Sequence, residues 1–289
     1  MTEVTGVPKM KIAWATDVHF DWVKDPVIRS FCERIRADGA EALLLGGDIA
    51  LAGQLRRVLG FLAETFKLPI YFVLGNHDYY GSYVRAVHRE MEDLPSELLR
   101  WLPAEGIVAL NDTVGLVGNG GWGDGRNGDF AGSRIVLNDF QYIGDLRESF
   151  GILDKRGAPD HREGLAACLK RLGEDAAGAL APSLAEAVSR FSTVMVLTHV
   201  PPFPEASWHQ GRRSDIYWLP FFTCRAIGDL LLDVAASHPE VRFEVLCGHT
   251  HSPGEARLLP NLVVHTGGAT YGSPAYRIIE LGEGEISLL

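Results

Sequence analysis

The sequence predicts an α/β fold whose first strands pair in parallel. Two observations support this prediction. Short apolar runs alternate with helical segments from Lys11 to Leu74, which is the pattern of strands joined by crossover helices. Five apolar runs are also followed closely by Asp, Asn or His, as expected where strands end in a functional loop. Right-handed crossovers then place such strands side by side in one sheet.

The first quarter of the chain alternates strand and helix. Lys11–Thr16 is a short apolar run, and we expect a strand. Asp25–Ala37 repeats apolar residues at helical spacing and has a proline near its start, where proline fits a helix. Ala42–Leu45 and Ile70–Leu74 are predicted buried strands. Between them, Leu55–Phe66 has helical spacing and is followed by a proline.

The next segments are less regular. Ser82–Leu102 predicts a helix interrupted at Pro95, and two short strands are expected at Ile107–Leu110 and Val114–Val117. Gly118–Gly132 holds seven glycines, too many for a regular element. We therefore expect a loop there, and loops at strand ends often carry function.

Two helical segments precede the next strand. Ile135–Leu146 and Arg162–Phe191 are expected to be helical, and the second is alanine-rich with a break near Pro182. Thr193–Leu197 predicts a strand, and Val200–Pro220 predicts a long loop rich in Pro, Trp and Arg.

The C-terminal part predicts one helix, Phe221–Ala236, and then mainly strands. These strands are expected at Phe243–Leu246, Ala256–Leu259, Leu262–His265 and Tyr276–Leu281. The chain contains no internal repeat and no convincing linker. We therefore expect a single domain over residues 1–289, with a helical insertion.

Composition restricts the class of protein. With 46% hydrophobic and 22% charged residues, the chain is typical of a soluble globular protein, and 289 residues suffice for a substantial core. The formal net charge of −10 argues against a dedicated nucleic-acid binder, because such binding depends on basic surfaces. It does not exclude a small anionic substrate, because bound metal ions supply positive charge locally.

The sequence also gives expectations about the cellular location of the protein and the redox state of its cysteines. The N-terminus lacks the apolar stretch of a signal peptide, and no segment has the roughly 20 consecutive apolar residues that span a bilayer. We expect a cytoplasmic protein without membrane attachment; the oligomeric state is not indicated. No CxxC pair occurs, so we expect reduced and mostly buried thiols at Cys32, Cys168, Cys224 and Cys247.

Five short motifs carry the chemistry. Each lies where a predicted strand gives way to a loop, and such strand ends meet at one edge of a sheet. Imidazole and carboxylate together favour Mn, Fe, Co, Ni or Zn over an all-oxygen Mg or Ca site. A dinuclear metal site is therefore expected. The motifs are Asp17-Val18-His19, Gly46-Gly47-Asp48, Gly75-Asn76-His77-Asp78, Thr198-His199 and Gly248-His249-Thr250-His251.

Taken in this order, the motifs D-x-H, G-G-D, G-N-H-D, H and G-H-x-H resemble those of the calcineurin-like metallophosphoesterase superfamily. The resemblance spans Asp17 to His251. It implies a four-layer α/β/β/α sandwich of two mixed β-sheets. It also implies that one metal is held by Asp17, His19, Asp48 and His251, and a second by Asp48, Asn76, His199 and His249.

The resemblance further implies roles for two residues beside the ligands. His77 faces the leaving group of the substrate, and Asp78 fixes its imidazole. The implied activity is hydrolysis of a phosphoester P–O bond by attack of a metal-bridging hydroxide, with Mn favoured. By formal count the loaded site carries a charge of about +1, which attracts a small phosphorylated substrate to an acidic protein. A protonated His77 would donate to the leaving oxygen.

Several alternatives stay open at this stage. The substrate is a monoester or a diester, and a non-catalytic metal-binding scaffold of the same fold is a rival hypothesis. A nuclease is a third, disfavoured by the acidic balance.

Trp122, Asp124 and Arg126 are candidates for the wall of the substrate pocket; alternatively, Trp122 packs beneath the glycine-rich loop. Asp21 contacts a group beside the site, or it faces solvent or caps a local turn. Tyr79 and Tyr80 border the site, or one of them belongs to the core, and His209 and Tyr271 are further candidates for the rim. Arg212 and Arg213, with Trp208 and Tyr217, either bind a phosphate or nucleobase or are simply solvated.

Overall fold

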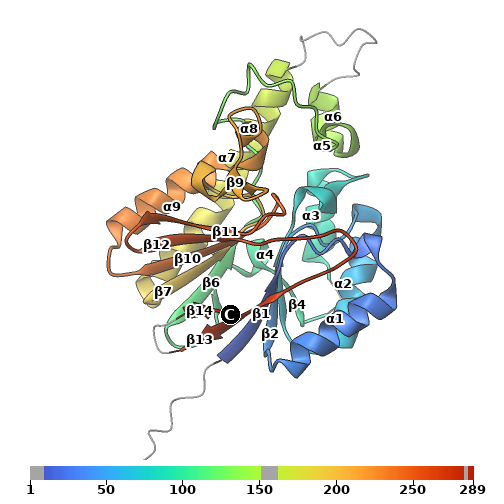
Figure 1. Cartoon of the computed structure of the whole chain (residues 1–289), viewed down its shortest axis with the longest axis vertical. Helices are drawn as coiled ribbons and strands as arrows, with labels where there is room; N and C mark the ends of the chain where they lie inside the picture. The colour runs from blue at the N-terminus through green and yellow to red at the C-terminus, as the bar shows by residue number, and fades with distance from the viewer. Residues whose placement is uncertain (1–9, 95, 151–161, 283–285) are drawn as a thin grey trace, which may run out of the picture.

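A computed structural model describes residues 10–94, 96–150, 162–282 and 286–289. Two six-stranded mixed sheets lie against each other in its centre (Figure 1). The first sheet has the order β14 (Ile286–Leu288), β13 (Arg277–Leu281), β1 (Met10–Ala15), β2 (Ala42–Gly46), β3 (Ile70–Val73) and β4 (Leu99–Trp101). The second has the order β11 (Gly254–Leu259), β12 (Leu262–Thr266), β10 (Arg242–Cys247), β7 (Thr193–Leu197), β6 (Val114–Gly118) and β5 (Val108–Ala109).

The central strands are parallel, and the parallel pairing predicted for the first three strands, β1 to β3, is confirmed. β1 to β4 pair in parallel in the first sheet, and β6, β7, β10 and β12 do so in the second. The antiparallel strands β13, β14, β11 and β5 complete the outer positions. The carboxyl ends of the parallel strands therefore face one end of the molecule, which is the upper end in Figure 1.

Side chains of alternate residues divide between two kinds of core. Ile12 and Trp14 of β1 pack between the sheets, in one cluster with Met195 and Leu197 of β7. The intervening residues, such as Ala13, belong to a second cluster that includes the buried faces of the helices. Because strand side chains alternate with a period of two, each sheet is covered on both faces. This arrangement confirms the predicted sandwich of two mixed sheets with helices around them.

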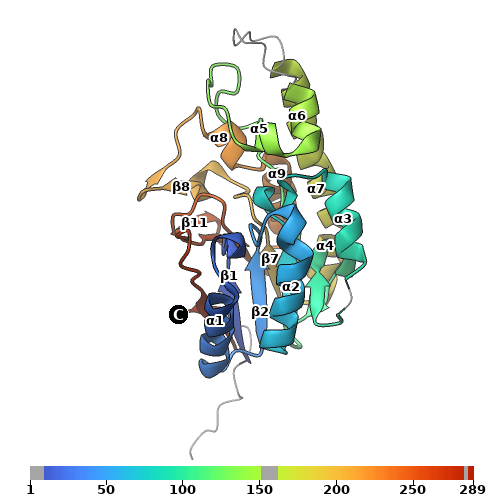
Figure 2. The ribbon, with the colours of Figure 1, turned by 90° about the vertical axis from the view of Figure 1, so that its right-hand side faces the viewer.

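Helices form the outer layers (Figures 1 and 2). On the side of the first sheet lie α1 (Asp25–Ala37), α2 (Ala52–Phe66) and α3 (Val84–Glu92), and on the side of the second lie α7 (Arg162–Arg190) and α9 (Arg225–Ser237). At the upper end of Figure 1 are α5 (Asp139–Tyr142), α6 (Gly144–Phe150) and α8 (Leu219–Phe222). The remaining short elements are α4 (Leu102–Glu105), the 3-10 turns η1 (Phe20–Trp22), η2 (Asn76–Tyr79) and η4 (Pro204–Ala206), and the hairpin β8 (Trp208–His209) and β9 (Arg212–Arg213).

The prediction of a helix over Ser82–Leu102 is wrong for the second half of this segment. Helix α3 ends at Glu92, and Leu99–Trp101 forms the edge strand β4 beside β3. Leu99 and Trp101 are buried on either side of a half-buried arginine, which is the alternation of a strand. Pro95, where an interruption was expected, lies outside the described residues.

The break expected near Pro182 does not occur. Helix α7 runs through this proline, which lies on its exposed face between the buried side chains of Leu180 and Leu184. The carbonyl that loses its helical hydrogen bond belongs to the exposed Gly178, so water can satisfy it. Packing of the buried face therefore outweighs a proline cost of about 3 kcal/mol.

Three further boundaries differ from the predictions. The helix expected over Ile135–Leu146 starts only at Asp139 and is split into α5 and α6 at Ile143, whose backbone is extended. The helix expected over Phe221–Ala236 is divided between α8 and α9. The loop Val200–Pro220 contains the small hairpin, and the last strand, β14, was not predicted.

Two other expectations concern the whole chain. The four cysteines are free and buried, as predicted. In the described part of the chain, no helix has both the length and the apolar character needed to cross a bilayer.

Candidate metal centre

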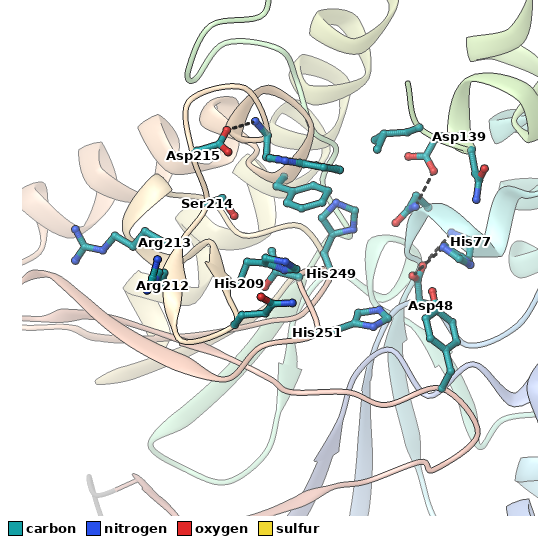
Figure 3. Close-up of a pocket in the computed structure, with 18 of the residues that line it drawn as sticks. Asp48, His77, Asp139, His209, Arg212, Arg213, Ser214, Asp215, His249 and His251 are labelled. Atoms are coloured by element: carbon teal, nitrogen blue, oxygen red, sulfur yellow. Dashed lines mark hydrogen bonds and ion pairs between the residues drawn. The ribbon is translucent and has the colours of Figure 1, made fainter. Parts of the chain in front are cut away.

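Residues from all five motifs meet at the carboxyl ends of five strands. Asp17 and His19 follow β1, Asp48 follows β2, and Asn76 follows β3 in the first sheet. In the second sheet, His199 follows β7, and His249 and His251 follow its neighbour β10. The site therefore lies where the two sheets open toward the upper end of the molecule, and Figure 3 shows part of it.

One group of four side chains surrounds a common point. Atoms able to bind a metal in Asp17, His19, Asp48 and His251 all lie within 4.8 Å of one another. His19 Nε2 and His251 Nε2 are 3.3 Å apart, and His251 Nε2 is also 3.3 Å from Asp17 Oδ1. His19 Nε2 lies 3.8 Å from Asp48 Oδ2. This group is a candidate metal site.

A second group lies on the other side of the same aspartate. His199 Nε2 is 3.4 Å from Asp48 Oδ1, 3.1 Å from Asn76 Oδ1 and 3.2 Å from His249 Nδ1. Oδ2 of Asp48 thus faces the first group, and Oδ1 faces the second. One carboxylate lies between two clusters of nitrogen and oxygen donors.

These spacings fit the coordination shells of transition metals. Metal–nitrogen bonds of about 2.0–2.1 Å in a tetrahedral shell place neighbouring ligand atoms about 3.3–3.4 Å apart. The nitrogen pairs His19–His251 and His199–His249 lie close to this spacing, at 3.3 and 3.2 Å. Converging imidazole nitrogens and carboxylates suit borderline divalent ions better than Mg or Ca.

Contacts outside the cluster orient the members of the second group. His199 Nδ1 lies 2.9 Å from the carbonyl of Gly46, and His249 Nε2 lies 3.2 Å from the carbonyl of Phe221. A carbonyl only accepts, so each of these nitrogens carries a proton, and His199 Nε2 and His249 Nδ1 are the nitrogens that face the ligand group. Such outer hydrogen bonds are usual for metal-binding histidines.

The backbone at the site adopts a left-handed conformation in several non-glycine residues. Positive φ values of 43–69° occur at five of the predicted ligands: Asp17, His19, Asp48, His249 and His251. Among the described non-glycine residues, only Lys67 and Gln210 share this feature. Such residues are uncommon and cost of order 1–3 kcal/mol when strained, so their concentration here points to a functional site.

Two glycines permit the close approach of the loops. A Cβ atom on Gly75 would lie 2.2 Å from Asp48 Oδ1, and one on Gly248 would lie 2.1 Å from Asp17 Oδ2. Backbone hydrogen bonds then join the loops, from Asp17 N to Gly47 O (3.0 Å) and from His77 N to Asp48 Oδ1 (2.9 Å). The ligand cluster is therefore held by the backbone of several loops at once.

Electrostatics of the metal-free protein divide the ligand histidines into two pairs. Burial opposes protonation of His199 and His251, but the Asp17 and Asp48 charges raise the pKa of both. Burial, together with neighbouring histidines, lowers the pKa of both His19 and His249 to about 3. Burial raises the pKa of Asp48 to about 7, an effect increased by the Asp17 charge. Burial also opposes ionisation of Asp17, but the charges of His199 and His251 and a hydrogen bond from Thr16 hold its pKa well below the usual range. Bound cations would stabilise both carboxylates as anions.

His77 lies beside the cluster rather than in it. Its Nε2 is 3.9 Å from Asp48 Oδ2, and its ring stacks on Tyr80 with centroids 4.4 Å apart. Burial lowers the pKa of His77, although the Asp139 charge opposes this shift. The imidazole still borders a cavity of about 850 Å³, toward which part of its surface is exposed. This cavity is the pocket drawn in Figure 3.

Asp78 was expected to contact the His77 imidazole, but its hydrogen bonds go to backbone N–H groups instead. Its Oδ1 accepts hydrogen bonds from the backbone N–H groups of Ile49 (2.8 Å) and Ala50 (2.9 Å), and its Oδ2 accepts one from Gly75 (2.8 Å). The side chain is fully buried. Asp78 therefore joins the loop after β2 to the loop after β3.

The rim of the pocket contains part of the predicted set. His209, Arg212, Arg213, Tyr80 and Tyr271 line it, and the Tyr271 ring stacks on His19 with centroids 4.3 Å apart. Arg212 and Arg213 lie on the far side of His249 and His251 from Asp48 (Figure 3).

The three candidates in the glycine-rich loop are not among the lining residues. Trp122 packs on Tyr79, with ring centroids 5.0 Å apart. Asp124 is buried and accepts a hydrogen bond from Ala226 N at the start of α9 (2.8 Å), and Arg126 pairs with Glu174. All three residues have structural contacts, and for Trp122 packing was the alternative that the sequence left open.

Asp139 is a site residue that the sequence did not indicate. Its Oδ1 accepts a hydrogen bond from Asn76 Nδ2 (2.9 Å) and another from the Tyr80 hydroxyl (2.5 Å). It belongs to α5, between β6 and β7, and is not part of any of the five motifs. No local pattern marks an aspartate in this predicted helical segment as a neighbour of a residue 63 positions earlier.

Comparison with known proteins identifies the family. The profile of calcineurin-like phosphoesterases matches residues 10–253, so the chain belongs to this family. No curated protein matches the chain at a significant level.

Solved structures share the fold at low sequence identity. A dimetal phosphatase from Danio rerio aligns with a TM-score of 0.58 at 15% identity, covering 96% of this chain and 94% of that one. The phosphopantetheinyl hydrolase of Mycobacterium tuberculosis aligns with a TM-score of 0.59 at 14% identity, with 90% of each chain covered. GAP50, described as the anchor in the inner membrane complex of Plasmodium, aligns with a TM-score of 0.52 at 12% identity, covering 97% and 83%.

Proposed function

We propose that the protein is a dinuclear-metal-dependent phosphohydrolase that cleaves a phosphoester P–O bond. The observation that carries this proposal is the position of Asp48. Its two carboxylate oxygens face two separate groups of donors, each within 3.8 Å of the nearest histidine nitrogen. A carboxylate placed between two ligand groups is the element that a two-metal site requires.

The ligand sets proposed from the geometry are those expected from the sequence. Asp17, His19, Asp48 and His251 would hold one ion, and Asp48, Asn76, His199 and His249 the other. A pair of such ions lowers the pKa of bound water and neutralises charge on phosphoryl oxygens. Mn is the favoured candidate, and Fe, Zn, Co and Ni suit the same donors.

The role proposed for His77 is to act on the leaving oxygen of the substrate. The imidazole is directed by its stacking on Tyr80 and lies beside Asp48 without belonging to either ligand group. Because its pKa is lowered, the neutral ring is the relevant form near neutral pH. A neutral imidazole still carries one N–H, and this N–H is the donor available to the leaving oxygen.

The pocket supports a small phosphorylated substrate. A volume of about 850 Å³ holds a drug-sized molecule. Arg212 and Arg213 add positive charge to the rim of an otherwise acidic protein. A cytoplasmic location is part of the same proposal, as is the absence of nucleic-acid and membrane partners; the monoester or diester nature of the substrate is left to the assay.

The test is hydrolysis of p-nitrophenyl phosphate and bis-p-nitrophenyl phosphate by the purified protein with Mn²⁺. Asp48→Asn should reduce turnover by about 100-fold or more, since loss of even an outer partner of a metal site costs 10–100-fold. The same variant should bind less Mn²⁺ in equilibrium dialysis. Full activity of the Asp48→Asn enzyme would contradict the proposal.

A non-catalytic scaffold is the rival function. The same fold occurs in the Plasmodium protein described as an anchor, so the fold alone does not decide between the two. Two bound metals without activity on a panel of nucleotides, cyclic nucleotides, sugar phosphates and phosphoproteins would favour the scaffold.

A further inference from the structure

Asn76 is the one carboxamide among the proposed ligands, and its side chain has two ends of nearly equal shape but opposite hydrogen-bonding character. The carbonyl oxygen of a carboxamide is a metal ligand and an acceptor, whereas the amino group is only a donor. Rotation by half a turn exchanges the two ends with little change in packing. The second ligand group therefore needs a contact that determines which end faces His199.

Asp139 provides that contact. A carboxylate only accepts hydrogen bonds, so the group of Asn76 that lies 2.9 Å from Asp139 Oδ1 is the amino group. The carbonyl oxygen then faces His199 Nε2, at 3.1 Å. We propose that Asp139 is a positioning residue of the second metal site, which holds the Asn76 carboxamide in the orientation that can bind an ion. This inference rests on the proposed dinuclear function.

The cost of burying Asp139 supports this role. The residue is 8% exposed, and within the described ranges its carboxylate forms no ion pair. Its polar partners are the Asn76 amide and the Tyr80 hydroxyl, both neutral. A buried carboxylate without a cation is unfavourable. A divalent ion beside Asn76 would supply the missing positive charge.

The position of Asp139 is fixed from outside the ligand cluster. Gly81 N donates to Tyr142 O (2.8 Å), Gly144 N donates to Ser82 O (2.8 Å), and Val84 N donates to Asp145 Oδ2 (2.8 Å). These bonds join α5 and α6 to the residues that directly follow η2. The Tyr80 hydroxyl adds a second donor to the same carboxylate oxygen of Asp139. Figure 3 shows Asp139 above His77 at the wall of the pocket, with its bond to the Asn76 amide dashed.

The experiment compares Asp139→Ala with Asp145→Ala. Both substitutions remove a carboxylate that joins the α5–α6 segment to the residues after β3, but only Asp139 contacts a proposed ligand. Binding of Mn²⁺ is measured by titration calorimetry and equilibrium dialysis. The electron paramagnetic resonance spectrum reports whether the two ions are spin-coupled. Thermal unfolding of each metal-free variant measures its stability.

We expect the wild-type protein and Asp145→Ala to bind two Mn²⁺ ions with a coupled spectrum. Asp139→Ala should bind one ion normally and the other about 10–100-fold more weakly, which is the usual effect of losing an outer partner. Asp139→Asn keeps a carbonyl acceptor and should lose less. If Asp139→Ala does not fold, Asp139→Asn and Tyr80→Phe serve as the test instead.

Two results would overturn the role proposed for Asp139 but leave the proposed dinuclear function standing. These are two ions bound with unchanged affinity in Asp139→Ala, or an equal loss in Asp145→Ala, which would mark the effect as general to the segment. Fewer than two ions in the wild-type protein would overturn the proposed function as well.

Discussion

At the residue scale, the centre depends on which atom each polar side chain presents. His199 and His249 each bond a backbone carbonyl through one ring nitrogen and present the other to the ligand group. Asp48 presents one oxygen to each side. Asp78 belongs to the same motif as His77, but its carboxylate accepts hydrogen bonds from three backbone N–H groups. Adjacent residues of one motif thus have different tasks, one at the pocket and one in the framework.

His77→Ala separates catalysis from metal binding. The imidazole borders the pocket and is not a member of either ligand group, so we expect both ions to bind as in the wild-type protein. Loss of the N–H that the neutral ring donates to the leaving oxygen should lower kcat by about 10²–10³-fold, the usual effect of removing one hydrogen-bond donor from a developing negative charge. Metal content by mass spectrometry and steady-state kinetics measure the two effects. His238→Ala, at the exposed end of α9, is the control and should change neither. Loss of an ion in His77→Ala would place this histidine among the ligands.

At the element scale, tight loops at the ends of β1, β2, β3, β7 and β10 bring the motifs together. Their close approach requires glycine at positions that face a ligand, and it places five polar residues in the left-handed region of φ. The strain in these loops is balanced by the hydrogen bonds between them, such as that from His19 N to Asp48 O (2.9 Å).

Gly75→Ala should damage the site through a steric clash. The added methyl group would lie 2.2 Å from Asp48 Oδ1 and 2.5 Å from Asp48 N, so the loop after β2 must move. We expect weaker binding of both ions, because Asp48 serves both groups. Gly60→Ala is the matched control. It lies in α2 with open space around the new methyl group and should stabilise the protein by about 1 kcal/mol. Unchanged Mn²⁺ affinity in Gly75→Ala would show that the loop accommodates the methyl group.

Pro182→Ala tests how packing overrides local preference in α7. The proline is exposed and lies inside a continuous helix, so alanine restores a backbone hydrogen bond without loss of buried surface. We expect stabilisation of about 1–3 kcal/mol, reduced in part because the unfolded chain gains freedom. Urea unfolding monitored by circular dichroism measures it. A destabilised variant would mean that the helix near residue 182 depends on the proline.

At the scale of the whole molecule, the centre joins two sheets that otherwise meet through apolar side chains. Asp17, Asp48 and Asn76 come from the first sheet, and His199, His249 and His251 from the second. Bound ions would therefore cross-link the two halves of the sandwich at the end where the strands stop. They would also relieve the burial of two neighbouring carboxylates.

Metal removal should consequently destabilise the whole fold. An ion present at about 1,000 times its dissociation constant adds about 4 kcal/mol to the free energy of unfolding. For a chain of this length, we expect chelation to lower Tm by about 5–10 °C. Differential scanning calorimetry before and after chelation, followed by readdition of Mn²⁺, measures the effect. A Tm that is independent of metal would contradict the cross-linking role.

The sequence by itself determined three things: the parallel pairing of β1 to β3, the family, and the polar residues that follow the strands. Apolar periodicity is a local property of the sequence. The residue types Asp, Asn and His are themselves those of metal ligands, so they indicate a metal site before their positions in space are known. Only the tertiary structure decided the strand Leu99–Trp101, the continuity of α7 through Pro182, the backbone partners of Asp78 and the contact of Asp139 with Asn76. The physical reason is common to all four. Each depends on contacts between segments distant in the chain, or on which face a helix buries, and neither is encoded in the residues nearby.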